Sequence, residues 1–456
     1  MNTRLAILLI TDALLAVTAL FSAALVRFGH TALREELSFE QSLKITAIFV
    51  SIELFSSYLM DVYVEDRHCG RKEIFLNSLQ GGAAAFFFLS VVYYVDPSVI
   101  LGRGVLFFAI AFFILFQSCL HSLAASGQQV PHFSRRVLIL GTGRLARQLG
   151  ELCGSGAGNF TLAGYLPCEG RREPDSQSLG ELLLPMDGEL LQTARKAKAG
   201  LLVIAPSERR GGLPLQQMMR CKLNGVEVVD APTFYEMAQG KLMLEEMTPS
   251  WIIFSTGFRR TTLINIYKRC LDVLLSLFGL LLSAPLFPVV ALAIRLESHG
   301  PTFFRQVRVG SGEQPFVIYK FRSMCQDAER DGAVWAVKND ARVTRVGRFL
   351  RNSRIDEIPQ LYNVLRGDMS FIGPRPERPE FVETLKKDIY YYSKRHTIKP
   401  GLTGWAQVRY PYGATVEDAI EKLRYDLYYI KNLSVFLDTQ IFFETVKVVL
   451  FGRGGR

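Results

Sequence analysis

The chain has 456 residues, a length that suits about three domains rather than one. Lys and Arg number 53 against 43 Asp and Glu, and this formal net charge of +10 suits nucleic acid, anionic lipid or phosphorylated partners. Seven cysteines stand singly and six histidines form no ligand cluster, which argues against a disulfide framework and against a zinc site.

Four long, mainly apolar segments occupy the first part of the chain. They are Leu5–Val26, Leu43–Met60, Ile74–Tyr94 and Val105–Ala125. Each is close to the ~20 residues that a helix needs to cross a bilayer. A cleaved signal peptide followed by buried core helices is the alternative. Lys and Arg are concentrated in the second loop and after the fourth segment, so we expect a four-helix transmembrane bundle at 1–128 with both ends in the cytoplasm.

Apolar runs that alternate with helical stretches follow the bundle. "RRVLILG", "TLAGYL", "GLLVIAP" and "VEVVDAP" are typical of buried parallel strands, so we expect a Rossmann-like α/β domain at 129–250. Its first strand leads into a G-x-G-x-x-A turn at Gly141 and Gly143, which could receive the pyrophosphate of a dinucleotide. The same glycines also serve a tight structural turn, and Glu169 is the only nearby acid for a ribose. Whether this domain binds a ligand stays open.

A further uncharged run, from Val273 to Ile294, is long enough to be a fifth span. Basic residues flank both of its ends, however, and Pro285 and Pro288 interrupt it. A proline removes an intrahelical hydrogen bond and favours a kink. After a linker at 251–264 we therefore predict a re-entrant helical hairpin over 265–298, broken at Pro285. A straight span is the alternative, and it would place the basic C-terminal part on the side of the membrane without nucleotides.

Cations and two adjacent carboxylates gather farther along the chain. They include Lys320, Arg322, Arg351, Asp356, Glu357 and Arg375. Arginine and lysine both suit the oxygens of a diphosphate. A helix from about Pro359 to Gly367 would have the carboxylates at its positive end. Adjacent carboxylates can bind Mg²⁺, and one of them can attack phosphorus. A solvated helix cap is the alternative for an isolated Asp-Glu pair.

Residues 265–452 closely resemble the bacterial sugar transferases, the monotopic phosphoglycosyl transferases. The resemblance rests on an ordered series of motifs: "KRCLDVLLSL", "GPTFFRQVRVG", "YKFRSM", "RVTRVGRFLRNSRIDEIPQLYNVLRGDMSFIGPRPE", "KPGLTGWAQV" and "YDLYYIKNLS". The four spans and the α/β domain resemble the large members that start exopolysaccharide or O-antigen assembly. "RYPYGATVEDAIEKLRYDLYYIKN" is similar to the subgroup linked to exosortase loci.

This resemblance implies a specific reaction. A UDP-sugar loses UMP to give an aspartyl-phosphosugar intermediate, and the phosphosugar then passes to polyprenyl (undecaprenyl) phosphate. By motif position Asp356 is the nucleophile and Glu357 its catalytic partner, both with a role at Mg²⁺. Lys320, Arg351 and Arg375 fall where the family contacts phosphate, and we group Arg322 with them.

The resemblance also implies where the enzyme works and with what. We expect a mixed α/β catalytic domain at 265–456 on the cytoplasmic face of the bacterial inner membrane. The expected partners are the lipid bilayer and a second copy of the chain. We expect no binding to nucleic acid.

The sequence departs from the family at two places. Ala284-Pro285 stands where the family often has Ser-Pro, and "RYPYG" replaces the asparagine and glycine that often follow "AQV", so the transferred sugar is not named. The C-terminal "VFLDTQIFFETVKVVLF" fits the membrane interface or ordinary core packing equally well. A membrane-anchored nucleotide-sugar dehydratase and a non-catalytic sensor that binds a nucleotide at Gly141 and Gly143 are the competing functions. The dehydratase would need a second glycine-rich fingerprint and a Tyr-x-x-x-Lys pair, and we find no convincing version of either.

Overall fold

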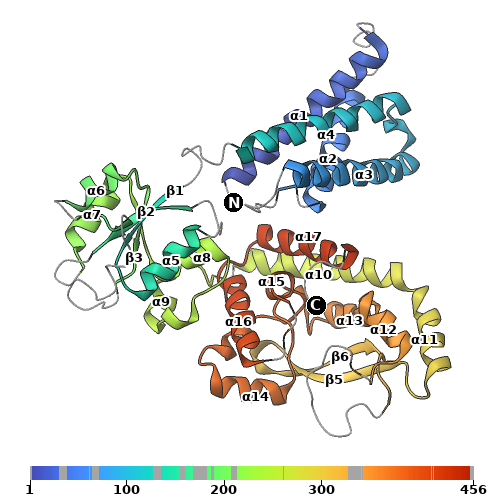
Figure 1. Cartoon of the computed structure of the whole chain (residues 1–456). Coiled ribbons are helices and arrows are strands. Elements are labelled where there is room, and N and C mark those ends of the chain that lie inside the picture. Colours follow the sequence, from blue (N-terminus) through green and yellow to red (C-terminus); the bar gives the residue numbers. More distant parts are fainter. Residues whose placement is uncertain are drawn as a thin grey trace. The chain divides into compact units, whose positions relative to one another are not determined.

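The computed structural model describes most of the chain and divides it into two compact units, 1–229 and 230–456. The described residues are 3–29, 39–60, 62–63, 71–126, 135–154, 160–167, 182–185, 189–206, 213–259, 261–326, 340, 342–411, 413 and 415–451. Figure 1 shows the helices and strands of both units.

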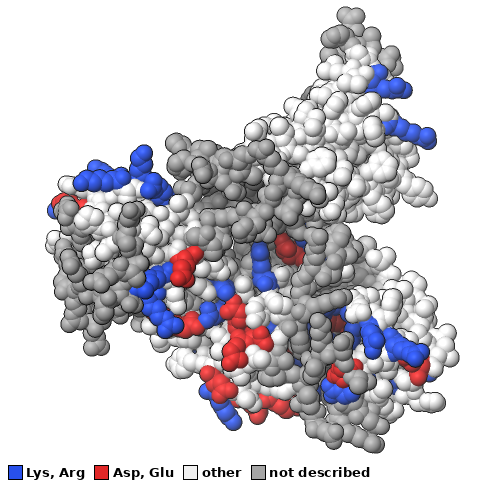
Figure 2. All heavy atoms as spheres, viewed as in Figure 1, with Lys and Arg blue, Asp and Glu red and all other residues white. Residues whose placement is uncertain are grey.

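Four long helices begin the first unit. They are α1 (Thr3–Phe28), α2 (Phe39–Leu59), α3 (Arg71–Val95) and α4 (Arg103–Ser126), with a short turn η2 (Pro97–Val99) before α4. All four are long and apolar enough to cross a membrane. Phe49 and Phe113 fill the bundle core, while Phe87 and Phe107 are exposed, as expected of a surface that faces lipid. In Figure 2 the bundle surface carries few charged side chains. The four predicted spans are confirmed as helices of spanning length.

The rest of the first unit is an α/β region around one parallel sheet. Its elements are β1 (Arg135–Leu140), α5 (Arg144–Gly154), β2 (Phe160–Leu166), α6 (Leu190–Lys196), β3 (Leu201–Ile204), α7 (Leu215–Leu223) and β4 (Glu227–Asp230). The strands lie in the order β2-β1-β3-β4, and β1 pairs in parallel with both β2 and β3. These are the four strands that the apolar runs predict. Leu138, Leu140 and Leu202 lie in the hydrophobic core of this α/β region.

The predicted glycine turn joins β1 to α5, and packing explains its first glycine. Gly141 has φ +133°, and a Cβ there would lie 2.1 Å from the carbonyl oxygen of Ala205. A side chain at this position is therefore excluded by the neighbouring backbone. This contact supports the structural reading of the turn. Glu169, the candidate ribose acid, lies outside the described residues.

The second unit begins at Asp230. Its first elements are α8 (Ala231–Gln239), η5 (Leu244–Glu246) and α9 (Pro249–Phe254). Asp230 ends β4 and caps α8 by accepting a hydrogen bond from the Thr233 amide. Leu242 and Met247 then enter the main apolar core of the C-terminal unit. The boundary therefore lies at 229/230, where the sheet ends.

Two helices bent by 61° follow, α10 (Thr262–Ser283) and α11 (Leu286–Glu297). Pro285 lies at the break, as predicted. The Ser283 hydroxyl donates a hydrogen bond of 2.6 Å to the Gly279 carbonyl one turn earlier in α10.

The remaining elements complete the second unit. They are β5 (Phe303–Val309), η6 (Ser311–Glu313), β6 (Pro315–Phe321), α12 (Arg345–Asn352), η7 (Ile355–Glu357), α13 (Gln360–Arg366), β7 (Ser370–Ile372), α14 (Pro379–Asp388), η8 (Tyr392–Thr397), β8 (Gly401–Thr403), α15 (Trp405–Arg409), α16 (Val416–Lys431) and α17 (Val435–Phe451). The strands β5 and β6 form an antiparallel hairpin, and β7 pairs in parallel with β8. Leu437 and Ile441 of α17 enter the main core, so one face of this helix packs as an ordinary core helix does.

Candidate active site

The two carboxylates lie in a short 3₁₀ turn, η7, between α12 and α13. Arg354 precedes this turn with a left-handed φ of 59°, which reverses the chain direction after α12. The helix α13 then starts after Pro359 and ends at Gly367, which has φ +100°. Both ends match the sequence prediction. The turn holds Asp356 in a buried position.

Glu357 is surrounded by cations from three parts of the chain. Its Oε1 accepts hydrogen bonds from Lys320 Nζ of β6 at 2.8 Å and from Arg375 Nη2 at 2.7 Å. Arg354 Nη1 lies 3.8 Å from its Oε2. Burial raises the pKa of Glu357, but the charges of Arg375, Lys320 and Arg354 outweigh it and hold this pKa well below the ordinary value. These charges therefore favour the anionic form of Glu357, which pairs with Lys320 and Arg375.

Asp356 has a different environment from its neighbour. Burial raises its pKa, and the charge of Glu357 adds to this rise, while Lys320, Arg351 and Arg375 oppose it. Within the described residues, its buried Oδ1 has no hydrogen-bond partner. A buried polar atom without a partner is expensive and calls for an explanation. Asp356 lines a cavity large enough for a substrate, and a ligand bound there would supply the missing partner.

This cavity has a volume of about 510 Å³ and brings together all six residues that the sequence singles out. They are Lys320, Arg322, Arg351, Asp356, Glu357 and Arg375. Arg322 nevertheless has a structural task, because its guanidinium donates to the carbonyls of Ser298 at 2.7 Å and His299 at 3.0 Å. Arg351 Nε donates to the Ser323 hydroxyl at 2.9 Å. Gly141 and Gly143 belong to the first unit and form no part of this cavity.

Several charged residues that line the cavity were not assigned from the sequence. They are Arg308, Glu377, Arg395, Lys422 and Asp426. Four of them, Arg308, Glu377, Arg395 and Asp426, lie in or beside family motifs without an evident chemical role. The fifth, Lys422, could have been found from its i, i+4 spacing with Asp426, which places both side chains on one face of α16.

The cavity offers one carboxylate oxygen that suits a divalent cation. The described residues contain no group of three His, Cys, Asp or Glu side chains arranged around a metal. Mg²⁺ is commonly held by one or two carboxylates while phosphates and water complete its shell, so the unpartnered Oδ1 of Asp356 fits it. Glu357 fits less well, because Lys320 and Arg375 already occupy its Oε1.

Comparisons with known proteins cover the part of the chain that contains this cavity. Residues 263–452 match the family described as bacterial sugar transferase. Over 239 residues the chain is 42% identical to the UDP-N-acetylgalactosamine-undecaprenyl-phosphate N-acetylgalactosaminephosphotransferase of Aeromonas hydrophila, covering 52% of this chain and 56% of that protein. It is 43% identical over 183 residues to the UDP-glucose:undecaprenyl-phosphate glucose-1-phosphate transferase of Klebsiella pneumoniae, covering 40% of this chain and 39% of that protein.

A third relative is matched over almost its whole length. The exopolysaccharide production protein PSS of Rhizobium leguminosarum bv. phaseoli is 42% identical over 187 residues, which cover 40% of this chain and 94% of that protein. The chain thus spans about half of the Aeromonas protein but nearly all of the Rhizobium protein. The chain belongs to the bacterial sugar transferase family.

Proposed function

We propose that the protein transfers a sugar 1-phosphate from a UDP-sugar to polyprenyl phosphate and releases UMP. We further propose that this reaction initiates the synthesis of an exopolysaccharide or O-antigen. The names of the Aeromonas and Klebsiella relatives support this donor and this acceptor. The observation that carries the proposal is the position of Asp356, whose buried and unpartnered oxygen lies among cations in one cavity.

The charges of the site suit a diphosphate. Ten cations and four carboxylates line this cavity, which gives it a formal net charge of +6. The diphosphate of a UDP-sugar carries two negative charges, so its binding neutralises part of this excess. Arginine is suited to hold phosphate oxygens with two parallel hydrogen bonds. The cations thereby position the sugar-bearing phosphorus next to Asp356.

The proposed chemistry has two displacements at one phosphorus atom. A carboxylate oxygen of Asp356 attacks the phosphorus that bears the sugar, and the bond from this phosphorus to the bridging oxygen breaks with departure of UMP. An oxygen of polyprenyl phosphate then attacks the same phosphorus, and the Asp356 carboxylate leaves. Carboxylates act as such nucleophiles in other enzymes. Asp356 would help to hold a magnesium ion, which would supply further neutralisation of negative charge. Glu357 holds Lys320 and Arg375 in position throughout.

We infer that α10 and α11 form a re-entrant hairpin in the cytoplasmic leaflet of the inner membrane. The 61° bend at Pro285 and the cations at both ends of the pair support a return to the same side. This topology keeps the cavity on the side that contains UDP-sugars. We also propose that the sheet region is Rossmann-like and has a mainly structural or dimer-forming role, and the exosortase-linked subgroup stays a resemblance.

The test is UMP release by the purified full-length protein in detergent micelles that contain polyprenyl phosphate. UDP-glucose, UDP-N-acetylglucosamine and UDP-N-acetylgalactosamine form the donor panel. We expect UMP release from at least one donor and none from the Asp356→Asn variant, which keeps the side-chain shape but removes the anionic nucleophile. UMP release by this variant at the wild-type rate would contradict the proposal.

A further inference from the structure

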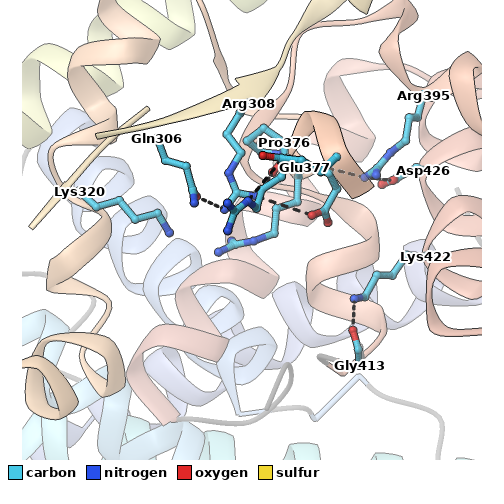
Figure 3. Close-up of polar contacts among 12 residues, drawn as sticks. Gln306, Arg308, Lys320, Pro376, Glu377, Arg395, Gly413, Lys422 and Asp426 are labelled. Atoms are coloured by element: carbon cyan, nitrogen blue, oxygen red, sulfur yellow. Dashed lines mark hydrogen bonds and ion pairs between the residues drawn. The ribbon is translucent and has the colours of Figure 1, made fainter. Parts of the chain in front are cut away.

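A second set of charged side chains lines the same cavity, and its members pair with one another. Arg308 Nη1 of β5 lies 3.6 Å from Glu377 Oε2, and Arg395 Nη2 lies 2.7 Å from Asp426 Oδ2. Lys422 Nζ donates to the Gly413 carbonyl at 2.8 Å. Figure 3 shows the Arg308–Glu377 pair between Lys320 on one side and the Arg395–Asp426 pair on the other. This set thus lies beside the phosphate cations (Figure 3).

The chemistry of this second set differs from that of the phosphate cations. Arg308 and Glu377 balance each other, as do Arg395 and Asp426, so donors and acceptors alternate with little excess charge. Lys422 donates to a neutral carbonyl, and burial lowers its pKa despite the opposing charge of Glu377. Such a wall is poorly suited to a phosphate. It suits a neutral group with several hydroxyls, each of which donates and accepts a hydrogen bond.

Gln407 adds an acceptor to this wall. Its side chain lines the cavity, and its buried Oε1 has no hydrogen-bond partner within the described residues. Its Nε2 is fixed by a 3.1 Å hydrogen bond to the Leu402 carbonyl, so the orientation of the amide is set from behind. An oxygen that is held in place and unpaired points to a ligand that donates a hydrogen bond.

We propose that Glu377, Gln407 and Lys422 contact the hydroxyl groups of the transferred sugar and select among sugars. This inference rests on the proposed function. The relatives share the UDP part of the donor and differ in the sugar, as the Aeromonas and Klebsiella names state. Gly413, which holds Lys422, belongs to the "RYPYG" stretch where this chain departs from the family pattern. Lys422, the wall residue that this differing stretch holds, is therefore assigned to the part of the donor that differs.

The Arg395–Asp426 pair acts as a positioning element between the two parts of the cavity. Arg395 Nη2 also donates to the backbone carbonyl of Arg375 at 3.0 Å, and both members of the pair are buried. Because Arg375 holds Glu357, the wall that contacts the sugar is mechanically linked to the phosphate cations. These contacts fix the position of a sugar bound against α16 relative to the cations that bind its phosphate.

The experiment compares Lys422→Met and Glu377→Gln with the matched controls Lys387→Met and Glu383→Gln. Both control residues are exposed on α14 and do not line the cavity. Values of kcat/KM for UMP release are measured for the preferred UDP-sugar and for its epimers. The dissociation constant of UDP alone is measured by calorimetric titration in the same micelles. The affinity for UDP then reports whether each variant keeps a folded phosphate site.

For each wall variant we expect kcat/KM for the preferred donor to fall by about 10- to 100-fold, the effect of losing one hydrogen bond to a charged group. The preference between epimers should shrink, and the UDP dissociation constant should stay within about twofold of wild type. A loss of UDP affinity as large as the loss for UDP-sugar would overturn the inference, because the wall would then contact the nucleoside. Unchanged epimer preference would overturn it as well.

The two proposals fail in different ways. If the wild type binds a UDP-sugar but releases no UMP, the proposed function fails, and the ratio of UDP-sugar to UDP affinity still tests the wall. In that case the inference stands only if Lys422→Met changes this ratio by about 10-fold or more. If no UDP-sugar binds to the wild type, both proposals are wrong.

Discussion

Replacing Glu236 by glutamine tests whether α8 belongs to the C-terminal unit. Glu236 of α8 pairs with Lys431 of α16, and its second oxygen accepts a hydrogen bond of 2.7 Å from Asn432. Lys431 also lies over the ring of Trp251, 4.4 Å from its centroid. Both charged side chains are buried, with 8% and 6% exposure for Glu236 and Lys431. Glutamine keeps the shape of the side chain but leaves the buried ammonium group without a counterion.

The magnitude follows from burial. Removing one partner of a buried ion pair costs about 3–5 kcal/mol. Glutamine retains a hydrogen-bonding oxygen, so we expect the lower value, about 3 kcal/mol. For a unit of this size 1 kcal/mol shifts Tm by about 2–4 °C, which gives a fall of about 6–12 °C. The matched control is Glu245→Gln, since Glu245 pairs with Arg424 at the same junction but is 57% exposed. Exposed pairs contribute at most about 1 kcal/mol.

Tryptophan fluorescence during thermal unfolding in micelles measures this directly. Trp251 lies against Lys431, and Trp405 Nε1 donates to the Gly240 carbonyl at 2.8 Å, so both report on the junction. Trp335 lies outside the described residues and is replaced by phenylalanine in all proteins compared. The double variant Glu236→Leu/Lys431→Met removes both charges and should recover most of the lost stability. If Glu236→Gln lowered Tm no more than Glu245→Gln, α8 would not be an integral part of the C-terminal unit.

Three further predictions concern the site and its topology. Glu357→Gln leaves Lys320 and Arg375 without their shared anion, so single-turnover UMP release should slow by about 10²–10⁴-fold; a rate within about threefold of wild type would show that Glu357 is dispensable. EDTA should stop turnover and Mg²⁺ should restore it, and continued turnover in EDTA would exclude a divalent cation. In a cysteine-free background, Thr262→Cys and Ser311→Cys should both react with a membrane-impermeant reagent from the cytoplasmic side, and periplasmic labelling of the second position would contradict the re-entrant hairpin.

Features that depend on local chemistry could be predicted from the sequence. Length and apolarity identify α1 to α4, because a bilayer imposes a minimum helix length. Pro359 and Gly367 mark the ends of α13, since proline favours the first turn of a helix and glycine adopts the left-handed conformation after its last turn. Pro285 likewise marks the break between α10 and α11.

Features that depend on distant contacts could not be predicted. Glu236 of α8 contacts Lys431 of α16, which is 195 positions away, and no local sequence pattern indicates this contact. In the sequence Arg322 is as good a candidate for binding phosphate as Lys320, but its guanidinium binds the backbone carbonyls of Ser298 and His299. Asp426 shows its relation to the cavity only when α16 packs beside Arg395. Tertiary packing determines which cations of a basic segment line the cavity.

The most direct test of the central claim is the mass of the peptide that contains Asp356. The purified protein is incubated with its UDP-sugar in the absence of polyprenyl phosphate, quenched in acid, digested and analysed by mass spectrometry. The proposed mechanism predicts that this peptide gains the mass of one phosphosugar, that added polyprenyl phosphate removes it, and that Asp356→Asn never forms it. Turnover without this adduct, or an adduct and normal turnover in the Asp356→Asn variant, would contradict the assignment of Asp356 as the nucleophile.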